Sequence, residues 1–293
     1  MTLRAPPAER DVESLLEFGV VNLDKPAGPT AHQVSSWVGD LTGVDRAAHA
    51  GTLDPKVTGC LPVLTGDATR LAQALIGPKS YVAVLHLHGE PQAELAAVLE
   101  EFEGPLLQKP PRKSAVARQL RTREIHRLEA LEVEDRRVLL AIGCEAGTYV
   151  RKLCHDLGLA LGTGGHMGDL RRTAAEPFDD SALVTLHDLA DGLAELREFS
   201  REGPLREVVQ PAERALAHLP TVTIAPSAAV EVANGAPVYA PGVIAVEGAT
   251  PDQAAPPLVV SQTPDGAAVC LGRLIGDHDA DSGPVVDLER VLV

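Results

Sequence analysis

The sequence is poor in cysteine and lysine and contains no long apolar run. Its four cysteines form no C-x-x-C pair, so neither a disulfide framework nor a zinc site is indicated, and we expect them to be small buried hydrophobic residues. No segment approaches the roughly 18 apolar residues that a membrane-spanning helix requires, and the N-terminus is acidic rather than apolar. These absences predict a soluble, cytoplasmic protein without membrane association.

The charge balance is strongly acidic. Forty-one Asp and Glu residues stand against 26 Lys and Arg residues, only six of them lysine, and the formal net charge is −15. Such a balance argues against a generic nucleic-acid coat. Two interpretations remain open, a protein adapted to concentrated salt, where surface carboxylates keep the chain soluble, or an acidic protein from an ordinary environment.

The length and the charge distribution indicate two domains. At 293 residues the chain exceeds the usual size of one domain. Residues 181–293 hold six basic and 16 acidic side chains, whereas residues 1–180 hold 20 and 25, so any basic surface is expected in the first part. Gly-Pro and Leu-Pro steps mark a boundary near 205–220. Beyond it, short strands with Gly and Pro turns around a helix at 226–234 predict a small β-rich module.

The hydrophobic pattern of the first part alternates between strands, loops and helices. An apolar run at 18–23 ends in a Pro- and Gly-containing loop at 24–29, after which Thr30 caps a helix through about Gly39. The same rules predict a loop at 49–59, an apolar run at 60–64, a helix capped by Asp67 and ending at 77–78, a strand at 80–88, a helix at 91–103, a hairpin at 127–144, and a helix with a stripe of Val150, Leu153, Cys154 and Leu157.

One segment is basic within this acidic chain. Between Lys109 and Arg127 there are seven Lys or Arg residues and one acidic residue, Glu124. An ordinary solvated surface is the plain explanation, but the contrast with the rest of the chain makes the segment a candidate functional surface.

Four stretches of sequence carry a family resemblance. They are LDKPAGPTAHQV at 23–34, AHAGTLDPKVTGCLPV at 48–63, KSYVAVLHLHG at 79–89, and GTYVRKLCHDLG with GGHMGDLRRT at 147–158 and 164–173. In this order and spacing they resemble the TruB and dyskerin pseudouridine synthases. Residues 108–125 are similar to the archaeal and eukaryotic dyskerin branch rather than to the bacterial stand-alone tRNA enzyme, and residues 219–243 resemble a PUA domain. With the acidity of the chain, the resemblance points to a haloarchaeal member.

The resemblance implies an α+β fold in two domains. A pseudouridine synthase catalytic domain with a mixed, largely antiparallel sheet is expected at 17–205. A small, β-barrel-like PUA domain that binds RNA is expected at 206–293. Residues 1–16 are expected to form an N-terminal extension that could pack on the PUA domain.

The resemblance also assigns catalytic residues. Uridine becomes pseudouridine when the N-glycosidic bond breaks and the uracil is rejoined through carbon, with no redox change, so no metal or cofactor is expected. Asp54 matches the catalytic carboxylate, Arg151 the cation that holds it, and Tyr81 the tyrosine that packs against the target base. From the residues alone, Asp54 is equally a turn-forming Asp before Pro. Arg151 is equally a solvent-facing helix residue, and Tyr81 a core residue.

Further residues match the family's substrate contacts. Lys25 would support the active-site loops, Leu170 would form an apolar wall of the uracil pocket, and His49 would insert near the flipped nucleotide. Ordinary packing, surface charge and a turn histidine are the alternatives. A loop that closes over RNA would contact phosphates through Lys109, Arg112, Lys113, Arg118, Arg121 and Arg123.

The implied function is that of the catalytic subunit of an archaeal H/ACA ribonucleoprotein, which acts on ribosomal RNA and on the tRNA T-loop. A box H/ACA guide RNA would pair with the substrate and bind the PUA domain. Three small protein partners are implied, a zinc-ribbon, a β-barrel and a kink-turn-binding protein. Two alternatives stay open, a guide-independent tRNA pseudouridine synthase and a non-catalytic scaffold that binds H/ACA RNA.

Overall fold

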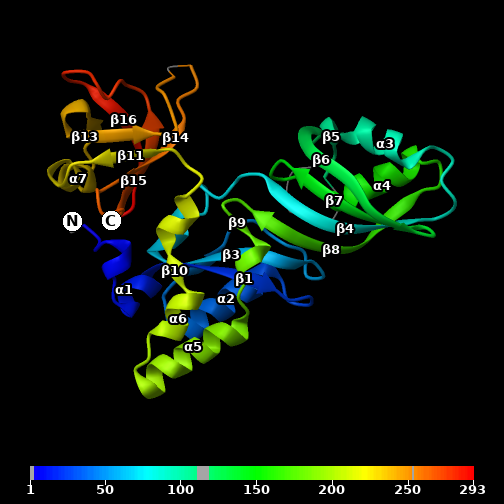
Figure 1. The fold of residues 1–293 in the computed structure, drawn as a ribbon, viewed down its shortest axis with the longest axis horizontal. Helices are drawn as coiled ribbons and strands as arrows, with labels where there is room; N and C mark the ends of the chain where they lie inside the picture. Colours follow the sequence, from blue (N-terminus) through cyan, green and yellow to red (C-terminus); the bar gives the residue numbers. More distant parts are fainter. Residues whose placement is uncertain (1–2, 111–118, 253) are drawn as a thin grey trace.

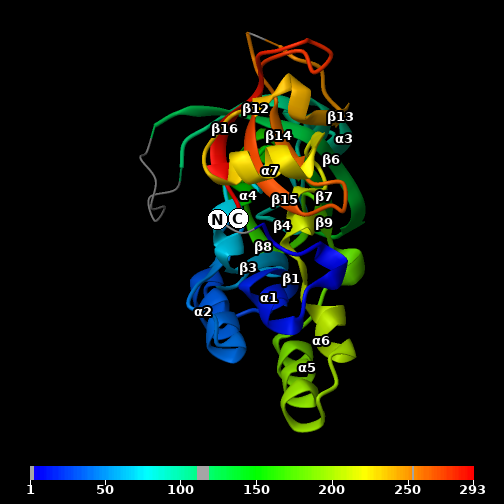
Figure 2. The ribbon, with the colours of Figure 1, turned by 90° about the vertical axis from the view of Figure 1, so that its left-hand side faces the viewer.

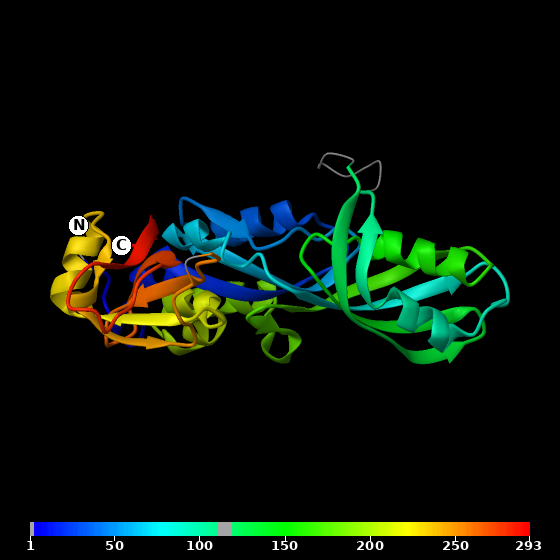
Figure 3. The same ribbon diagram turned by 90° about the horizontal axis from the view of Figure 1, so that it is seen from above.

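The computed structural model describes residues 3–110, 119–252 and 254–293, and it shows an elongated molecule with two β-sheets (Figure 1). The second sheet lies at one end of the long axis, and the strands β4 to β7 of the first sheet lie at the other (Figure 3). The two chain ends come together, since the Arg4 Nε donates a hydrogen bond to the Leu292 carbonyl at 2.9 Å.

The first sheet is mixed and largely antiparallel, as expected. Its path runs through β10 (Gln210–Pro211), β1 (Phe18–Lys25), β3 (Thr58–Gly66), β8 (Gly165–Ala175), β4 (Lys79–Leu87), β7 (Arg137–Cys144), β6 (Arg121–Glu134) and β5 (Gly104–Gln108), with β2 (Ala47–His49) on β3 and β9 (Phe178–Asp179) on β8. The β3–β8 pair is parallel, and it joins Gly59 to Arg172. That pairing brings together segments far apart in the chain.

The second sheet forms the curled, barrel-like C-terminal module that we expected. Its strands follow the order β12 (Val238–Tyr239), β16 (Pro284–Val291), β15 (Ala268–Leu274), β14 (Leu258–Gln262), β11 (Thr221–Ile224) and β13 (Val243–Glu247). Helix α7 (Pro226–Ala233) packs against it, close to the expected span of 226–234.

The α-helices of the first part are α1 (Val12–Glu17), α2 (Ala31–Thr42), α3 (Leu95–Phe102), α4 (Val150–Ala160), α5 (Leu186–Phe199) and α6 (Gly203–Val208). Five of them cover the first sheet in two groups. Helices α2, α5 and α6 lie below β1 and β3 in Figures 1 and 2, and the second sheet lies above these two strands. Helices α3 and α4 pack on the β4–β7 half, in the same core.

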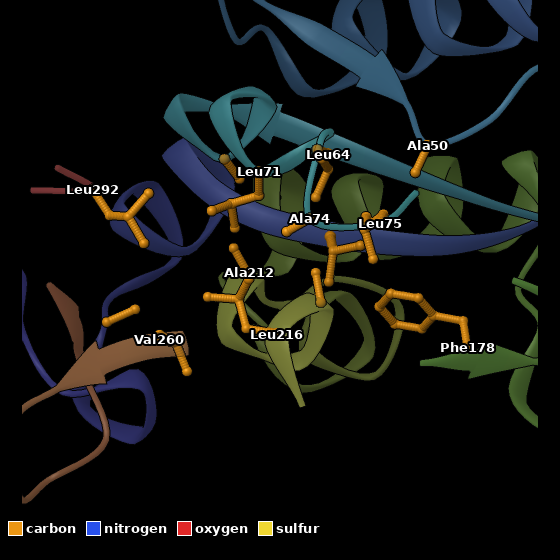
Figure 4. Close-up of a cluster of buried hydrophobic side chains, with 14 of the residues drawn as sticks. Ala50, Leu64, Leu71, Ala74, Leu75, Phe178, Ala212, Leu216, Val260 and Leu292 are labelled. Atoms are coloured by element: carbon orange, nitrogen blue, oxygen red, sulfur yellow. The ribbon is translucent and has the colours of Figure 1, made fainter. Parts of the chain in front are cut away.

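Strands β1 and β3 are buried on both faces, which explains their nearly continuous apolar sequences. In β1, Phe18 and Val20 face one core, while Val21 and Leu23 face the core under α2 and α5. The first of these cores also contains Val260 and Leu292 from the C-terminal module, so apolar packing joins the two sheets (Figure 4). A strand with two covered faces loses the alternation of polar and apolar residues.

Local signals placed two helices correctly. The Gln33 backbone amide donates a hydrogen bond to the Thr30 hydroxyl at 3.0 Å, and the Thr30 backbone amide donates one to the Gln33 side-chain oxygen at 2.9 Å. These two bonds form a capping box at the start of α2. That helix ends at Thr42, about one turn later than we expected, and Gly43 caps it with a φ of +77° that suits glycine. In α4 the predicted stripe of four apolar residues is buried.

The helix expected from Asp67 to 77–78 is wrong. A short 3-10 helix, η2 (Asp67–Leu71), takes its place and is followed by turns. The Asp67 carboxylate does not cap the backbone because it pairs with Arg4, Arg46 and Arg70. A tertiary ion-pair cluster has replaced the local capping bond.

The change from one sheet to the other falls between Pro211 and Thr221. Helix α6 packs in the core under β1, β10 pairs with β1, and the 3-10 helix η4 (Ala212–Leu216) lies in the joint core. The division at 205/206 stays a prediction, and the described packing places 206–211 with the first sheet.

Residues 3–10 contact both parts. Arg10 forms a bidentate pair with Glu213 at 2.6 and 2.8 Å, and Leu3 packs against the core of the second sheet. The remaining short 3-10 helices are η1 (Pro7–Glu9), η3 (Asp180–Ala182) and η5 (Ala240–Gly242).

The four cysteines are free and buried, as expected. Burial raises the pKa of Cys60, Cys144 and Cys270 to about 11. None of the helices in the described ranges is long and apolar enough to cross a membrane.

Candidate active site

Asp54 lies in the loop between β2 and β3. Its neighbours Leu53 and Val57 are buried in the core under α2, while the Asp54 side chain remains about half exposed, at 51%. The Val57 amide donates to the Asp54 carbonyl at 3.0 Å, which closes a turn. Asp54 is thus the turn-forming Asp that the residues alone allowed, and the buried neighbours hold its carboxylate in a fixed, solvent-facing place.

Lys25 supports the Asp54 loop through hydrogen bonds to backbone carbonyls. Its side chain is completely buried, and its Nζ donates to the carbonyls of Pro26, Pro55 and Val57 at 2.8, 3.0 and 2.8 Å. The Gly28 amide adds a bond to the Pro55 carbonyl at 2.8 Å. Two of the three carbonyls, those of Pro55 and Val57, lie within three residues after Asp54, and burial lowers the pKa of Lys25. The geometry fits the loop-supporting role that the resemblance gave this residue.

Arg151 reaches Asp54 across the site. The residue lies in the first turn of α4, and its guanidinium forms an ion pair with the Asp54 carboxylate. Both side chains are about half exposed, at 48% and 51%. Exposed ion pairs contribute roughly 0–1 kcal/mol to stability, so folding gains little from this one. The pairing is better explained by a need for an ionised, oriented carboxylate.

Tyr81 and Leu170 lie side by side on neighbouring strands. In the β4–β8 register, Tyr81 faces Arg172 and Ala83 faces Leu170. Both residues are half-buried and pack against the same two apolar cores. Burial raises the pKa of the Tyr81 phenol, and the nearby Arg172 guanidinium opposes that rise. Together the two side chains offer an apolar surface with one hydroxyl.

His49 ends β2, five residues before Asp54. The imidazole is half-buried, and its Nδ1 has no hydrogen-bond partner among the described residues. Burial lowers the pKa of His49, and the charges of Arg172 and His32 lower it further. A neutral imidazole at this place is compatible with insertion beside a nucleotide.

Arg172 is a residue of this site that sequence reasoning missed. The side chain is only 1% exposed, and it donates from Nε to the Cys60 carbonyl at 2.7 Å and from Nη2 to the Gly51 carbonyl at 3.2 Å. A signal was present, since Arg172 follows Leu170 by two positions in a strand and so shares its face. The adjacent Arg171 lies on the other face and pairs with Asp24 at 2.9 and 3.1 Å.

Three family models match the chain. They are "DKCLD (NUC011) domain" at residues 4–35, "TruB family pseudouridylate synthase (N terminal domain)" at 40–150, and "tRNA pseudouridylate synthase B C-terminal domain" at 151–217. A curated relative from Haloarcula marismortui, named "Probable tRNA pseudouridine synthase B", is 64% identical over all of this chain and 94% of its own length. The chain belongs to the TruB and dyskerin family of pseudouridine synthases.

Other members of the family extend the similarity to solved structures. A relative with the same name from Methanopyrus kandleri is 47% identical over 98% of this chain and 86% of its own. A chain from "Crystal Structure of a Cbf5-Nop10-Gar1 Complex" matches with a TM-score of 0.92 and 44% identity, over 99% of this chain and 90% of that one. A chain from "Structure of H/ACA RNP bound to a substrate RNA containing 2'-deoxyuridine" matches at 0.91 and 42%, over 99% and 90%. The pseudouridine synthase fold expected from the sequence is confirmed.

The basic segment is described in part. Lys109 is exposed and follows β5, while Arg121 and Arg123 lie at the start of β6. Arg123 pairs with Glu145 at 3.2 Å, so its charge is already engaged. Three predicted phosphate-binding residues lie outside the described residues, namely Arg112, Lys113 and Arg118.

Potential metal ligands gather elsewhere. In the described ranges, Asp277, His278 and Asp279 bring three such groups together, between β15 and β16. The group includes none of the predicted site residues. The candidate site contains an exposed carboxylate, Asp54, paired with Arg151, and two buried cations, Lys25 and Arg172, that donate hydrogen bonds to backbone carbonyls of the Asp54 loop.

Proposed function

We propose that this pseudouridine synthase is the catalytic subunit of an H/ACA ribonucleoprotein and modifies uridines in ribosomal RNA that is paired to a guide. The observation that carries the proposal is the similarity to a chain of the Cbf5-Nop10-Gar1 complex and to a chain of the H/ACA RNP bound to a substrate RNA, which extends over 99% of this chain at 42–44% identity. That similarity includes the C-terminal module, which the resemblance assigns to guide-RNA binding.

In this proposal Asp54 is the catalytic carboxylate. It acts at the C1′–C2′ region of the ribose, as a nucleophile or as the base for the sugar intermediate. Arg151 keeps it ionised and oriented. Tyr81 and Leu170 enclose the uracil, and the Tyr81 hydroxyl handles the C5 proton. Support comes from the ion pair and from the shared face of the two strands.

The binding residues complete the proposed site. Lys25 fixes the Asp54 loop, and His49 occupies space beside the flipped nucleotide. Lys109 and Arg121 contact phosphates, and Arg123 does so once RNA phosphate replaces Glu145 as its partner. The reaction needs no cofactor in this scheme. The partners are the substrate rRNA, the guide RNA and three small proteins of the zinc-ribbon, β-barrel and kink-turn-binding types. The reaction takes place in the cytoplasm.

A second candidate is a guide-independent enzyme that modifies the tRNA T-loop. The names of the curated relatives favour it, because they read "Probable tRNA pseudouridine synthase B". The scaffold alternative is disfavoured by the Asp54–Arg151 pair, since RNA binding needs no exposed carboxylate held by an arginine.

One experiment separates the two candidates. Pseudouridine formation by the wild-type chain is measured on a guide-paired rRNA fragment, with guide RNA and partner proteins present, and on a bare tRNA transcript. The proposal predicts product on the guided fragment that disappears when the guide is omitted. Full activity on tRNA without guide or partners, and none on the fragment, selects the second candidate. Tight binding of both RNAs without product selects the scaffold.

A further inference from the structure

The start of helix α4 has little local support. Tyr149 is its N-cap residue and makes no side-chain capping hydrogen bond, and the first turn contains no acidic residue. Two cations lie there instead, Arg151 and Lys152, although the positive end of the helix dipole disfavours positive charge. The residues at this helix start therefore do not by themselves favour a helix that begins here.

A buried glutamine from another element supplies the support. Gln108 is the last residue of β5, it is 3% exposed, and it lies 41 positions before Tyr149 in the chain. Its Oε1 accepts a hydrogen bond from the Tyr149 backbone amide at 2.9 Å, and its Nε2 donates one to the Tyr149 carbonyl at 3.4 Å. The same carbonyl accepts the backbone amides of Lys152 and Leu153 at 3.0 Å, in the first turn of α4. One carboxamide thus contacts both backbone groups of the residue at which the helix begins.

Burial explains why this contact is specific. A carboxamide at 3% exposure has lost its hydration, which is costly unless its oxygen and its amide group find partners. Gln108 finds both in Tyr149. An apolar side chain could fill the same space, but it could not hold the backbone in one direction. The two contacts fix the position and the direction of the chain two residues before Arg151.

The turn that precedes α4 has separate contacts with the sheet. The Glu145 carboxylate pairs with Arg123 at 3.2 Å and accepts the Glu124 backbone amide at 3.2 Å, and the Glu145 amide donates to the Glu124 carbonyl at 2.9 Å. These contacts hold the chain four residues before Tyr149. Loss of the Gln108 carboxamide should therefore leave the turn attached to β6 and release the start of the helix.

We propose that Gln108 is a positioning residue for the isomerisation, which fixes the start of α4 and so keeps the Arg151 guanidinium at the Asp54 carboxylate. The inference rests on the proposed roles of Asp54 and Arg151. Both side chains of that ion pair are about half exposed. Because an exposed pair gains little energy and restricts long side chains, it persists only where the backbone brings the two groups together.

A double-mutant cycle tests the proposal. kcat and KM for pseudouridine formation are measured for wild type, Gln108→Met, Arg151→Met and the double variant, on the RNA that the wild type modifies and with its full set of partners. Methionine has a similar length but lacks the amide donor and the carbonyl acceptor. We expect Gln108→Met to lower kcat about 10-fold and to change KM less than about 2-fold. In the Arg151→Met background the same substitution should have less than about a 3-fold further effect.

Gln92→Met is the matched control. Gln92 is exposed, and its backbone amide, which the substitution keeps, donates to the Leu161 carbonyl at the other end of α4 at 2.9 Å. Its kcat should stay within about 2-fold of wild type.

The outcomes separate this inference from the proposed function. If Gln108→Met slows wild type and Arg151→Met by the same factor, or changes only KM, the positioning role is wrong. A slow Arg151→Met beside a Gln108→Met with the wild-type kcat overturns the role of Gln108 alone. An Arg151→Met variant with the wild-type kcat overturns the proposed role of the arginine, and the role of Gln108 with it.

Gln108→Glu covers the case in which Gln108→Met does not fold. A protonated carboxyl group has the shape of the carboxamide and offers one donor and one acceptor, whereas a carboxylate cannot donate to the Tyr149 carbonyl. Burial favours the protonated form. The kcat of this variant, divided by that of wild type at the same pH, should rise as pH falls through the pKa of the new carboxyl. A ratio that does not change with pH would contradict the proposal.

Discussion

Lys25→Met is the sharpest test of how the Asp54 loop is held. The substitution removes three hydrogen bonds from a completely buried ammonium group. Each such bond is worth roughly 1.5–3 kcal/mol, but methionine also avoids a burial cost of several kcal/mol for the charge. The net loss in free energy of unfolding should be about 2–3 kcal/mol, which lowers the Tm of a chain of this length by roughly 3–5 °C.

The catalytic effect should be larger than the stability effect. Pro55 and Val57 lie within three residues after Asp54, and a shift of the carboxylate by about 1 Å costs on the order of 100-fold in rate. We therefore expect kcat to fall about 100-fold at a temperature where the variant is folded, with RNA affinity retained. Single-turnover kinetics and thermal unfolding measure the two effects separately.

Lys56→Met is the matched control, because Lys56 is exposed in the same loop. It should keep the wild-type Tm and kcat. A Lys25→Met variant with the wild-type kcat, or an equal loss in both variants, would refute the reasoning that the buried lysine sets the position of Asp54.

Three further predictions follow from the charges. Arg151→Met should lower kcat about 100-fold or more in single-turnover assays. The free energy of unfolding should fall by less than about 1 kcal/mol, because the ion pair is exposed. The control Lys152→Met should not lower kcat to this extent. Burial raises the pKa of the Cys270 thiol from 9.0 in the unfolded chain to about 11 in the folded chain. Between these pH values the unfolded chain loses the proton and the folded chain keeps it. The free energy of unfolding should therefore fall as pH rises from 9.0 to about 11, by about 2–3 kcal/mol for this thiol. Denaturant titrations should show a shallower fall for Cys270→Ala, and an unchanged slope would contradict the assignment. The net charge of −15 predicts a higher Tm in multimolar than in dilute potassium chloride, and no stabilisation would count against salt adaptation.

Local patterns predicted the elements whose signals lie close together in the chain. The capping box at Thr30 and the apolar stripe of α4 need only neighbouring residues, and both were placed well. Strand β4 was recognised from its alternation, and its bounds agree within one residue. The four cysteines were buried, as their scattered positions suggested.

Long-range interactions account for what the sequence left open. Asp67 pairs with three arginines rather than capping a helix, and one of them, Arg4, lies 63 residues away. The parallel contact of β3 with β8 brings Arg172 under a loop more than 100 residues earlier, which no local pattern indicates. Asp54 and Arg151 came from a family resemblance, because spacing alone does not show that a turn and a helix will meet.

The substitution Asp54→Asn is the decisive test of whether Asp54 is the catalytic carboxylate. Pseudouridine formation and RNA binding are measured together for wild type, Asp54→Asn and the exposed control Asp45→Asn, on the RNA that the wild type modifies. We expect Asp54→Asn to bind this RNA as wild type does and to form product at least about 10³-fold more slowly, while Asp45→Asn remains active. Product formation by Asp54→Asn at the wild-type rate would show that another group carries out the reaction.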